Sequence, residues 1–333
     1  VMVDGGFTAY SGLTARVPPD HTRIRKVAQS CFGPRRFKSI EPQIETIVAR
    51  HLDALAAQGG SGPVNFWETV AYPVPAYVLF TLMGIPDEDV PKIKQYGASR
   101  GAMTWGDPDD AAQVAIAHDM VAYWKYIHDL LDMRRANPGD DFPSDLLRLQ
   151  AEGADITNDE IAGVLYSTLF AGHETTSTFM GNYVLTIMQH RDAWEQLKAD
   201  PALIPNAVQE ILRMQVPLAH MRRTCTEDTE VFGQTIKAGD KVVLWYISAN
   251  RDEEVFENPD KLDITRENAR RHLSFGYGIH RCVGARLAEL QLKVLLEEMH
   301  KRRMRVHVAG DVERVRANFV HGFRKLEVEI TTF

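Results

Sequence analysis

The sequence is poor in cysteine, with three residues in 333, and these stand far apart at positions 31, 225 and 282. An odd number of widely spaced cysteines without a C-x-x-C pair does not form a disulfide framework. This composition suits a reducing compartment, and we expect a cytoplasmic protein. With so few cysteines, one in a distinctive setting calls for a chemical explanation.

The sequence also lacks an excess of positive charge and a long apolar run. Its 38 lysines and arginines face 45 aspartates and glutamates, a net charge of −7, which argues against a nucleic-acid-binding protein. The most apolar stretch, residues 74–85, is interrupted by Pro75 and is shorter than the roughly 20 residues that a membrane span needs. We therefore expect no nucleic-acid partner and no membrane span.

The most distinctive stretch that is present runs over residues 274–284 and reads S-F-G-Y-G-I-H-R-C-V-G. It contains Cys282, Phe275 seven residues earlier, and three glycines, at 276, 278 and 284. Glycine lets the backbone turn where a side chain would clash and approach a flat ligand closely. A buried thiolate is costly unless it is compensated, and a bound metal removes the thiol proton outright. The stretch therefore predicts a metal–thiolate site.

Three other interpretations of this stretch are weaker. Gly276 and Gly278 begin like a dinucleotide-binding fingerprint, but Arg281 stands where its third glycine belongs. His280 and Cys282 are a conceivable base and nucleophile, yet two positions along one loop are a poor geometry for such a pair. A buried structural cysteine would explain Cys282 but not the glycines and Phe275.

A second unusual stretch lies inside a predicted long helix. This helix begins at Thr157, where Asp159 and Glu160 complete a capping pattern, and is expected to run to about His190. Residues 171–176 within it read A-G-H-E-T-T. A glycine in mid-helix costs about 1 kcal/mol relative to alanine, and β-branched threonines add strain. The cluster therefore needs a reason to be there.

Three explanations of this cluster compete. His173 and Glu174 begin the H-E-x-x-H motif of metalloproteases, but Ser177 replaces its second histidine. Small residues for close helix crossing are the second explanation. A groove beside a ligand is the third, since serine and threonine hydroxyls can bond backwards to carbonyls and open a helix locally.

The rest of the chain alternates between helical and, later, strand-like periodicity. Proline and aspartate at 18–20 predict a helix start, with the Asp20 side chain as the cap. Further helices are predicted over residues 35–58, 66–83, 87–100, 108–135, 201–215 and 283–302. Short strands are predicted over residues 221–226, 230–232 and 241–245 and around 318–322.

The stretch F-G-Y-G-I-H-R-C-V-G resembles the haem-binding loop of the cytochrome P450 family, the haem-thiolate monooxygenases. Four further motifs stand in the order that the family has, at residues 21–25, 171–175, 210–213 and 266. The resemblance implies a mainly α, single-domain fold over residues 1–333, a helical bundle around haem with small β-sheets. Relatives have several tens of residues before the prolines at 18 and 19, so an N-terminal portion is expected to be missing.

The resemblance implies haem b as cofactor and Cys282 as its proximal iron ligand. The other residues expected to contact the cofactor are His21, Arg25, Ala171, Gly172, Arg223, Phe275, Gly276, His280 and Gly284. Within this set, His21, Arg25, Arg223 and His280 would pair with the propionates, and Gly172 would open room over the iron. Arg222 is adjacent to Arg223, and strand alternation would place the two on opposite faces.

The resemblance also implies roles for residues outside the set that contacts the cofactor. Glu174 and Thr175 would form the acid–alcohol pair that delivers protons to dioxygen. Glu210, Arg213 and Arg266 would give structural support under the haem loop. The expected substrate pocket consists of Phe170, Leu218, Ala219, Phe319 and Val320.

The implied activity is insertion of one atom of O2 into an apolar small molecule, with electrons from an NAD(P)H-linked partner. This partner would be ferredoxin with its reductase, or a fused reductase, because the sequence shows no flavin or iron–sulfur motif. Five basic residues are candidates for a docking patch or for an ordinary solvated cluster: Arg35, Arg36, Lys38, Arg281 and Arg286. A peroxide-driven enzyme and a non-catalytic haem gas-binding protein remain as alternatives, and the sequence does not give the substrate.

Overall fold

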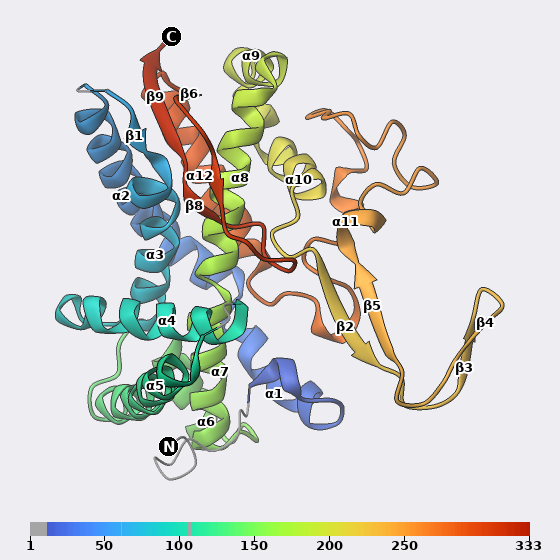
Figure 1. Ribbon diagram of the computed structural model, residues 1–333. Helices are drawn as coiled ribbons and strands as arrows, with labels where there is room; N and C mark the ends of the chain where they lie inside the picture. The colour runs from blue at the N-terminus through green and yellow to red at the C-terminus, as the bar shows by residue number, and fades with distance from the viewer. Residues whose placement is uncertain (1–11, 61, 106–107) are drawn as a thin grey trace.

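The computed structural model describes residues 12–60, 62–105 and 108–333, and helices make up most of it (Figure 1). The helices of its first half are α1 (Asp20–Ser30), α2 (Pro34–Gly59), α3 (Pro73–Met83), α4 (Val90–Trp105), α5 (Asp110–Ala136) and α6 (Phe142–Ala151). Those of the second half are α7 (Asn158–Ala171), α8 (Glu174–Gln189), α9 (Arg191–Ala199), α10 (Ile204–Met214), α11 (Tyr246–Ala249) and α12 (Ala285–Lys301).

The strands are short and form small antiparallel sheets. They are β1 (Val64–Asn65), β2 (His220–Thr224), β3 (Thr229–Val231), β4 (Gln234–Ile236), β5 (Lys241–Trp245), β6 (Met304–Val308), β7 (Glu313–Arg314), β8 (Phe323–Lys325) and β9 (Glu327–Thr332). They pair as β1–β9–β6, β2–β5, β3–β4 and β7–β8. The mainly α fold with small sheets, expected from the sequence, is confirmed.

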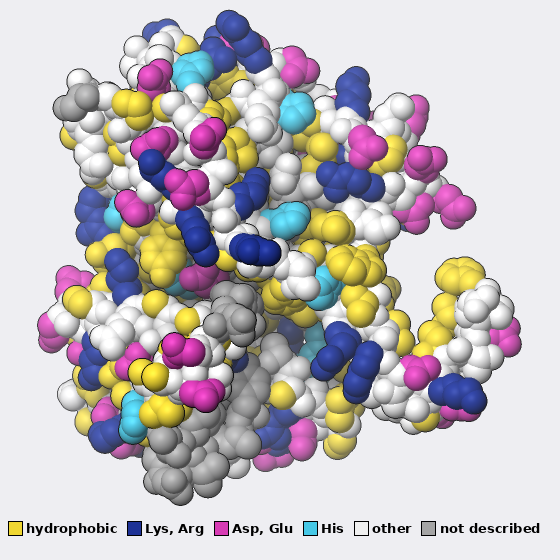
Figure 2. Space-filling view, in the orientation of Figure 1, with side chains coloured by type: hydrophobic (Ala, Val, Ile, Leu, Met, Phe, Trp, Pro, Cys, Tyr) yellow, Lys and Arg dark blue, Asp and Glu magenta, His cyan; other side chains and the backbone are white. Residues whose placement is uncertain are grey.

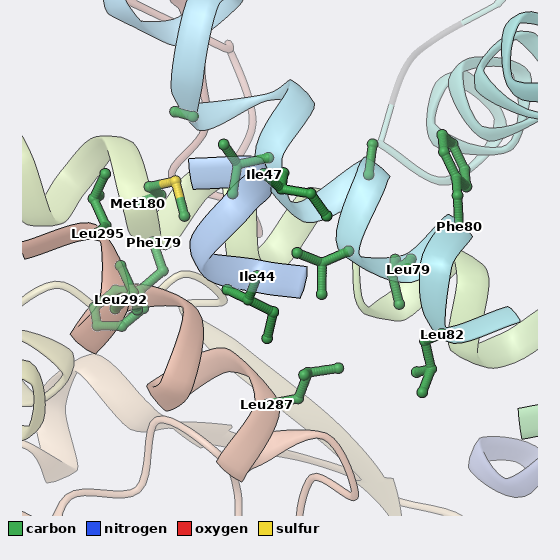
Figure 3. Packing of buried hydrophobic residues seen from close by; sticks show 14 of the residues in the cluster. Ile44, Ile47, Leu79, Phe80, Leu82, Phe179, Met180, Leu287, Leu292 and Leu295 are labelled. Carbon is green, nitrogen blue, oxygen red and sulfur yellow. The ribbon is translucent and has the colours of Figure 1, made fainter. Parts of the chain in front are cut away.

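The apolar core lies where α2, α3, α8 and α12 meet. Figure 3 shows their side chains converging, and the labelled ones are Ile44, Ile47, Leu79, Phe80, Leu82, Phe179, Met180, Leu287, Leu292 and Leu295. Burying one such side chain contributes about 1.5–3 kcal/mol. The predicted apolar stripe of residues 35–58 therefore holds α2 against the elements that carry the site.

The predicted helix from Thr157 to His190 is two helices that lie almost end to end through the molecule (Figure 1). The capping box at its start is present: the Thr157 hydroxyl accepts from the Glu160 N–H, and the Glu160 carboxylate accepts from the Thr157 N–H. The helix stops at Ala171 and resumes at Glu174. The glycine and the hydroxyl-rich segment that follows it make an unbroken helix unfavourable at this point.

The segment expected to form one bent, buried helix over residues 66–83 is also divided. A π-helical turn, Trp67–Ala71, precedes α3, which begins at Pro73. Proline has no N–H to donate, so it fits the first turn of a helix and ends the hydrogen-bond ladder before it. The division leaves Tyr72 between the π-helical turn and α3.

Three smaller expectations differ from the structure. Asp20 lies inside the first turn of α1, and its side chain makes no capping bond. The hairpin partner β4 was not predicted. Residues around 318–322 form no strand but one isolated bridge, between Leu218 and Val320.

No helix in the described part of the chain is long and apolar enough to cross a membrane.

Candidate cofactor site

Cys282 lies at the end of a loop that folds back on itself. Its N–H donates to the carbonyl oxygen of Phe275 at 2.9 Å. Gly276 and Gly278 have φ of 69° and 77°, the left-handed region that favours glycine. A Cβ at Gly276 would also come within 3.3 Å of the Tyr246 hydroxyl oxygen. Two of the three glycines are therefore required by the backbone.

Gly284 has a different role from the other two glycines. Its φ is −87°, which any residue adopts, and it is the N-cap of α12. The α12 N-terminus thus begins directly behind Cys282, where the helix dipole favours a negative sulfur. Burial raises the pKa of the Cys282 thiol, whereas the Gly284 N–H and the Arg25 and Arg281 guanidinium groups lower it.

The donor set at Cys282 fits a metal that brings its own further ligands. Among the described residues, no group of three or more His, Cys, Asp or Glu side chains is arranged to hold a metal ion. A single sulfur is therefore what the chain offers here. Cys282 is exposed in this structure, yet the loop around it raises the pKa of the thiol and favours the neutral form, a preference that a bound metal reverses by removing the proton. An iron held by a planar macrocycle meets these conditions.

A cluster of cationic and histidine side chains lies beside the loop. The rings of His21 and His280 are 4.4 Å apart. Burial lowers the pKa of both histidines, and Arg25 lowers both further; His21 and Arg223 also act on His280. Neither ring nitrogen of His21, although buried, has a hydrogen-bond partner among the described residues. Such a cluster fits the carboxylates of an anionic cofactor.

The same cluster borders an open cleft of about 470 Å³. The residues that line it are His21, Thr22, Arg25, Lys26, Gln29, Ser30 and Ile279. Arg223 and Arg222 alternate along β2, opposite Val242 and Val243 of β5. Of the two arginines, only Arg223 lowers the pKa of His280, so Arg223 is the one that belongs to the cluster beside the loop.

Glu210, Arg213 and Arg266 form a buried ion triad. The Arg213 Nε and Nη2 each donate to one Glu210 oxygen at 2.8 Å. The Arg266 Nε donates to the same carboxylate at 3.1 Å. The Glu210 and Arg213 side chains are fully buried, and the Arg266 side chain is 8% exposed. The triad brings α10 together with the irregular segment before the cysteine loop.

Asn250 connects this triad to the loop and was not singled out from the sequence. Its carbonyl oxygen accepts from Arg213 Nη1 at 2.8 Å. Its side-chain oxygen accepts from the Leu273 N–H at 2.7 Å, and its Nδ2 donates to the Ser274 hydroxyl at 2.9 Å. Asn250 is completely buried. The sequence gives no sign that an isolated asparagine will be buried, so it could not be predicted.

The helix break between α7 and α8 positions the predicted acid and alcohol. Burial raises the pKa of Glu174. The Thr175 hydroxyl donates to the Ala171 carbonyl oxygen at 2.7 Å, the oxygen that a continuous helix would have used. A Cβ on Gly172 would lie 3.0 Å from a Leu79 methyl carbon, so Leu79 of α3 takes the space that the glycine leaves. Ala171 is exposed.

Four of the five expected pocket residues lie where residues 218–219 pair with residues 319–320. The Ala219 N–H donates to the Phe319 carbonyl oxygen at 2.8 Å, and Leu218 and Val320 form the isolated bridge. Phe170 is on α7, and the carbon of the Arg100 guanidinium lies 4.5 Å from the centroid of its ring.

One of the five basic residues considered for a docking patch is already engaged. The Arg36 side chain is 10% exposed and pairs with Asp140 at 3.0 Å and Asp145 at 2.5 Å. It joins α2 to α6 and to the segment before it, so it does not offer its charge to a partner.

Comparison with known proteins agrees with this arrangement. The family model of cytochrome P450 matches residues 5–314. Linalool 8-monooxygenase of Pseudomonas putida is 35% identical over 327 residues, covering 93% of this chain and 75% of that protein. Erythromycin C-12 hydroxylase of Saccharopolyspora erythraea is 36% identical over 318 residues, covering 93% and 78%.

Solved structures are similar over nearly the whole chain. Cytochrome P450 CREJ in complex with (4-ethylphenyl) dihydrogen phosphate is 42% identical, with a TM-score of 0.92, covering 99% of this chain and 82% of that one. P450BioI in complex with an acyl carrier protein that carries hexadec-9Z-enoic acid is 30% identical, with a TM-score of 0.90 and coverages of 98% and 84%. The cysteine loop, the fold and these relatives together show that the chain belongs to the cytochrome P450 family, the haem-thiolate monooxygenases.

Proposed function

We propose that the protein inserts one atom of O2 into an apolar small molecule, with haem b as cofactor and electrons from an NAD(P)H-linked partner. One observation carries the proposal: a lone cysteine backed by a helix N-terminus stands beside four side chains suited to carboxylates. Ferredoxin with its reductase, or a fused reductase, is the partner that the family's chemistry requires.

The residues that would hold haem come from distant parts of the chain. The Cys282 sulfur would ligate the iron, with Phe275, Gly276 and Gly284 shaping the loop around it. His21, Arg25, Arg223 and His280 would donate charge-assisted hydrogen bonds to the propionates. Haem, when bound through a thiolate, supplies the electron density that favours O–O cleavage.

The chain's own contribution to the chemistry would be positioning and proton supply. The raised pKa of Glu174 lets its carboxyl hold a proton nearer to neutral pH than an exposed glutamate would. Thr175, the next residue, presents a hydroxyl at the same helix break. Ala171 would border the cofactor, and Gly172, which lies against Leu79 at the end of α7, would leave room beside it.

An apolar substrate is proposed from the walls of the pocket. Phe170, Leu218, Ala219, Phe319 and Val320 are each apolar, and four of them meet at one crossing. Linalool and erythromycin figure in the names of two relatives. Neither is assigned to this chain, because walls of this kind accept many apolar molecules.

The Glu174–Thr175 pair favours dioxygen over the two alternatives. Peroxide brings its own oxygen atoms and protons, and a gas-binding protein performs no turnover, so neither needs a proton supply. Thr175→Ala should therefore lower product formed per NAD(P)H consumed, while Thr175→Ser, which keeps the hydroxyl, should retain most of it. Unchanged coupling in Thr175→Ala, or activity with peroxide alone, would reverse the assignment.

The proposal is tested on the haem-loaded protein and its Cys282→Ser variant. The reduced protein under carbon monoxide should show the red-shifted absorbance of a thiolate-bound iron, and Cys282→Ser should lose it. Cys225→Ser is the matched control, because Cys225 lies in the β2–β5 region, away from the loop, and should keep the shift. A wild-type spectrum without the shift would overturn the proposal.

A further inference from the structure

The carboxylate of Glu160 joins three segments of the chain at the start of α7. It is buried, and it completes the capping box by accepting from the Thr157 N–H at 2.9 Å. The Arg23 guanidinium of α1 donates to both of its oxygens, from Nη1 at 2.9 Å and from Nη2 at 2.7 Å. Arg16, which lies before α1, approaches the same carboxylate at 3.5 Å. A paired guanidinium–carboxylate contact is a strong and geometrically specific form of ion pair.

The electrostatics of this contact keep both partners charged. Its hydrogen bonds from Arg23 lower the pKa of Glu160 to about 2, and the Thr157 N–H and Arg16 lower it further, against the opposing effect of burial. The same contact raises the pKa of Arg23. Arg23 Nη1 also donates to the Asp155 carbonyl oxygen at 2.7 Å, just before α7. The ion pair is therefore a permanent anchor of α1 on the N-terminus of α7.

The anchor and the side chains of the cofactor site project from different sides of α1. His21 and Arg25 are four positions apart and share one side of the helix, whereas Arg23, midway between them, projects from roughly the opposite side. The His21 ring packs 4.4 Å from that of His280, and Arg25 lowers the pKa of the Cys282 thiol. Because α1 has only 11 residues, a rotation that frees one side displaces the other.

The other partner of the anchor belongs to the helix that leads to the proton-supplying pair. Glu160 lies in the first turn of α7, and Glu174 and Thr175 follow the end of the same helix. One contact thus relates the helix of the cofactor-binding cations to the helix that precedes the acid and the alcohol. A buried carboxylate that loses its cation is left uncompensated, so this contact is costly to break.

We propose that Arg23 and Glu160 are positioning residues for the cofactor, and that their ion pair sets where His21 and Arg25 meet its carboxylates. The inference rests on the proposed function, which assigns those two side chains to the propionates. Neither Arg23 nor Glu160 touches the cofactor; both act through α1. Hydrogen bonds weaken steeply with misalignment, so a small rotation of α1 is enough to loosen the cofactor.

The first test measures the rate of haem release from the loaded protein to an excess of a haem-scavenging apoglobin. Arg23→Gln and Glu160→Gln should each speed release by roughly 5- to 50-fold, the coupling expected within one ion-pair network. Glutamine is accepted at this position of a capping box, so Glu160→Gln keeps the start of α7. The combined variant should release haem no faster than the faster single variant, because both substitutions remove one contact. Arg23→Lys keeps the charge without the fork and should restore part of the loss.

Two further measurements on the haem-loaded protein locate the effect. Amide hydrogen exchange should become faster in α1 of Arg23→Gln and stay unchanged in α12, which begins behind the cysteine. The reduction potential of the iron should fall, because carboxylates that lose cationic partners favour the more positive ferric state. Lys125→Gln is the control, since Lys125 forms an exposed ion pair with Asp129 on α5, and it should change haem release less than about twofold.

Three results would overturn the inference. The first is haem release within about twofold of wild type in either single glutamine variant. The second is an effect in the combined variant equal to the product of the two single effects. The third is exchange that quickens in α12 as much as in α1, the mark of a general loss of stability. Any of these in a wild type that shows the carbon monoxide shift contradicts this inference alone, whereas a missing shift contradicts the proposed function.

Discussion

The Nε2 of His173 lies 3.0 Å from the carbonyl oxygen of Tyr72. Their rings are also close, with centroids 4.4 Å apart. Because a carbonyl can only accept, this nitrogen carries the proton and the ring is the Nε2–H tautomer. The contact ties the break between α7 and α8 to the start of α3. It fixes the position of His173, the residue that directly precedes Glu174 and Thr175.

Replacing His173 should loosen this tie. His173→Leu leaves the Tyr72 carbonyl with only one side-chain donor, the Ser177 hydroxyl in a long hydrogen bond at 3.5 Å, and we expect a loss of about 1–3 kcal/mol in the free energy of unfolding, measured in urea. Product formed per NAD(P)H should fall as well, because the helix break is less fixed. His173→Gln keeps a donor and should recover part of both losses. Equal stability in wild type and His173→Leu would contradict the role.

Stability should fall as the solution is acidified from pH 6.5 to 4. Burial lowers the pKa of both His173 and His272 to about 4, from 6.5 in the unfolded chain. The unfolded state therefore binds more protons in this window, and stability rises with pH across it. Each histidine contributes up to about 3 kcal/mol above pH 6.5 that is lost by pH 4.

The measurement is the free energy of unfolding in urea at pH 7, 6 and 5. His173→Gln combined with His272→Gln removes both groups and should make the dependence less steep between pH 7 and 5, while other buried histidines such as His51 keep part of it. A slope as steep in this double variant as in the wild type would assign the effect to other groups.

Removing one member of the buried triad should be strongly destabilising. Glu210→Gln leaves the Arg213 and Arg266 charges without their common anion, and such a loss costs about 3–5 kcal/mol. Haem retention should fall too, because Arg213 reaches the cysteine loop through Asn250. Glu195→Gln removes a surface partner of Lys198 and should change stability by less than about 1 kcal/mol. Equal effects would mean that the triad is dispensable.

Two glycines of the same loop should respond differently to alanine. Gly276→Ala forces a side chain into left-handed backbone beside the Tyr246 hydroxyl, at a cost of about 1–2 kcal/mol. Gly284→Ala meets no atom within 4 Å and has an ordinary φ, so it should be nearly neutral. Thermal unfolding with bound haem measures both. A larger loss in Gly284→Ala would contradict this explanation of the loop.

The cysteine loop and the helix start at Thr157 could be predicted because their signals are local. The loop's residues stand within eleven consecutive positions, and the capping box spans four. The apolar stripe of α2 could also be predicted, because a period of 3.6 residues is a property of a single helix. The Glu210–Arg213 pair was visible for the same reason, one turn apart on α10.

The sequence by itself therefore determined the cysteine loop, the existence of most of the longer helices and the family to which the chain belongs. Only the tertiary structure decided which residues far apart in the sequence contact one another. It placed Leu79 in the space left by Gly172, Tyr72 against His173, and Arg100 over Phe170. These contacts join residues tens of positions apart, and side-chain periodicity carries no information about which helix a given face will meet.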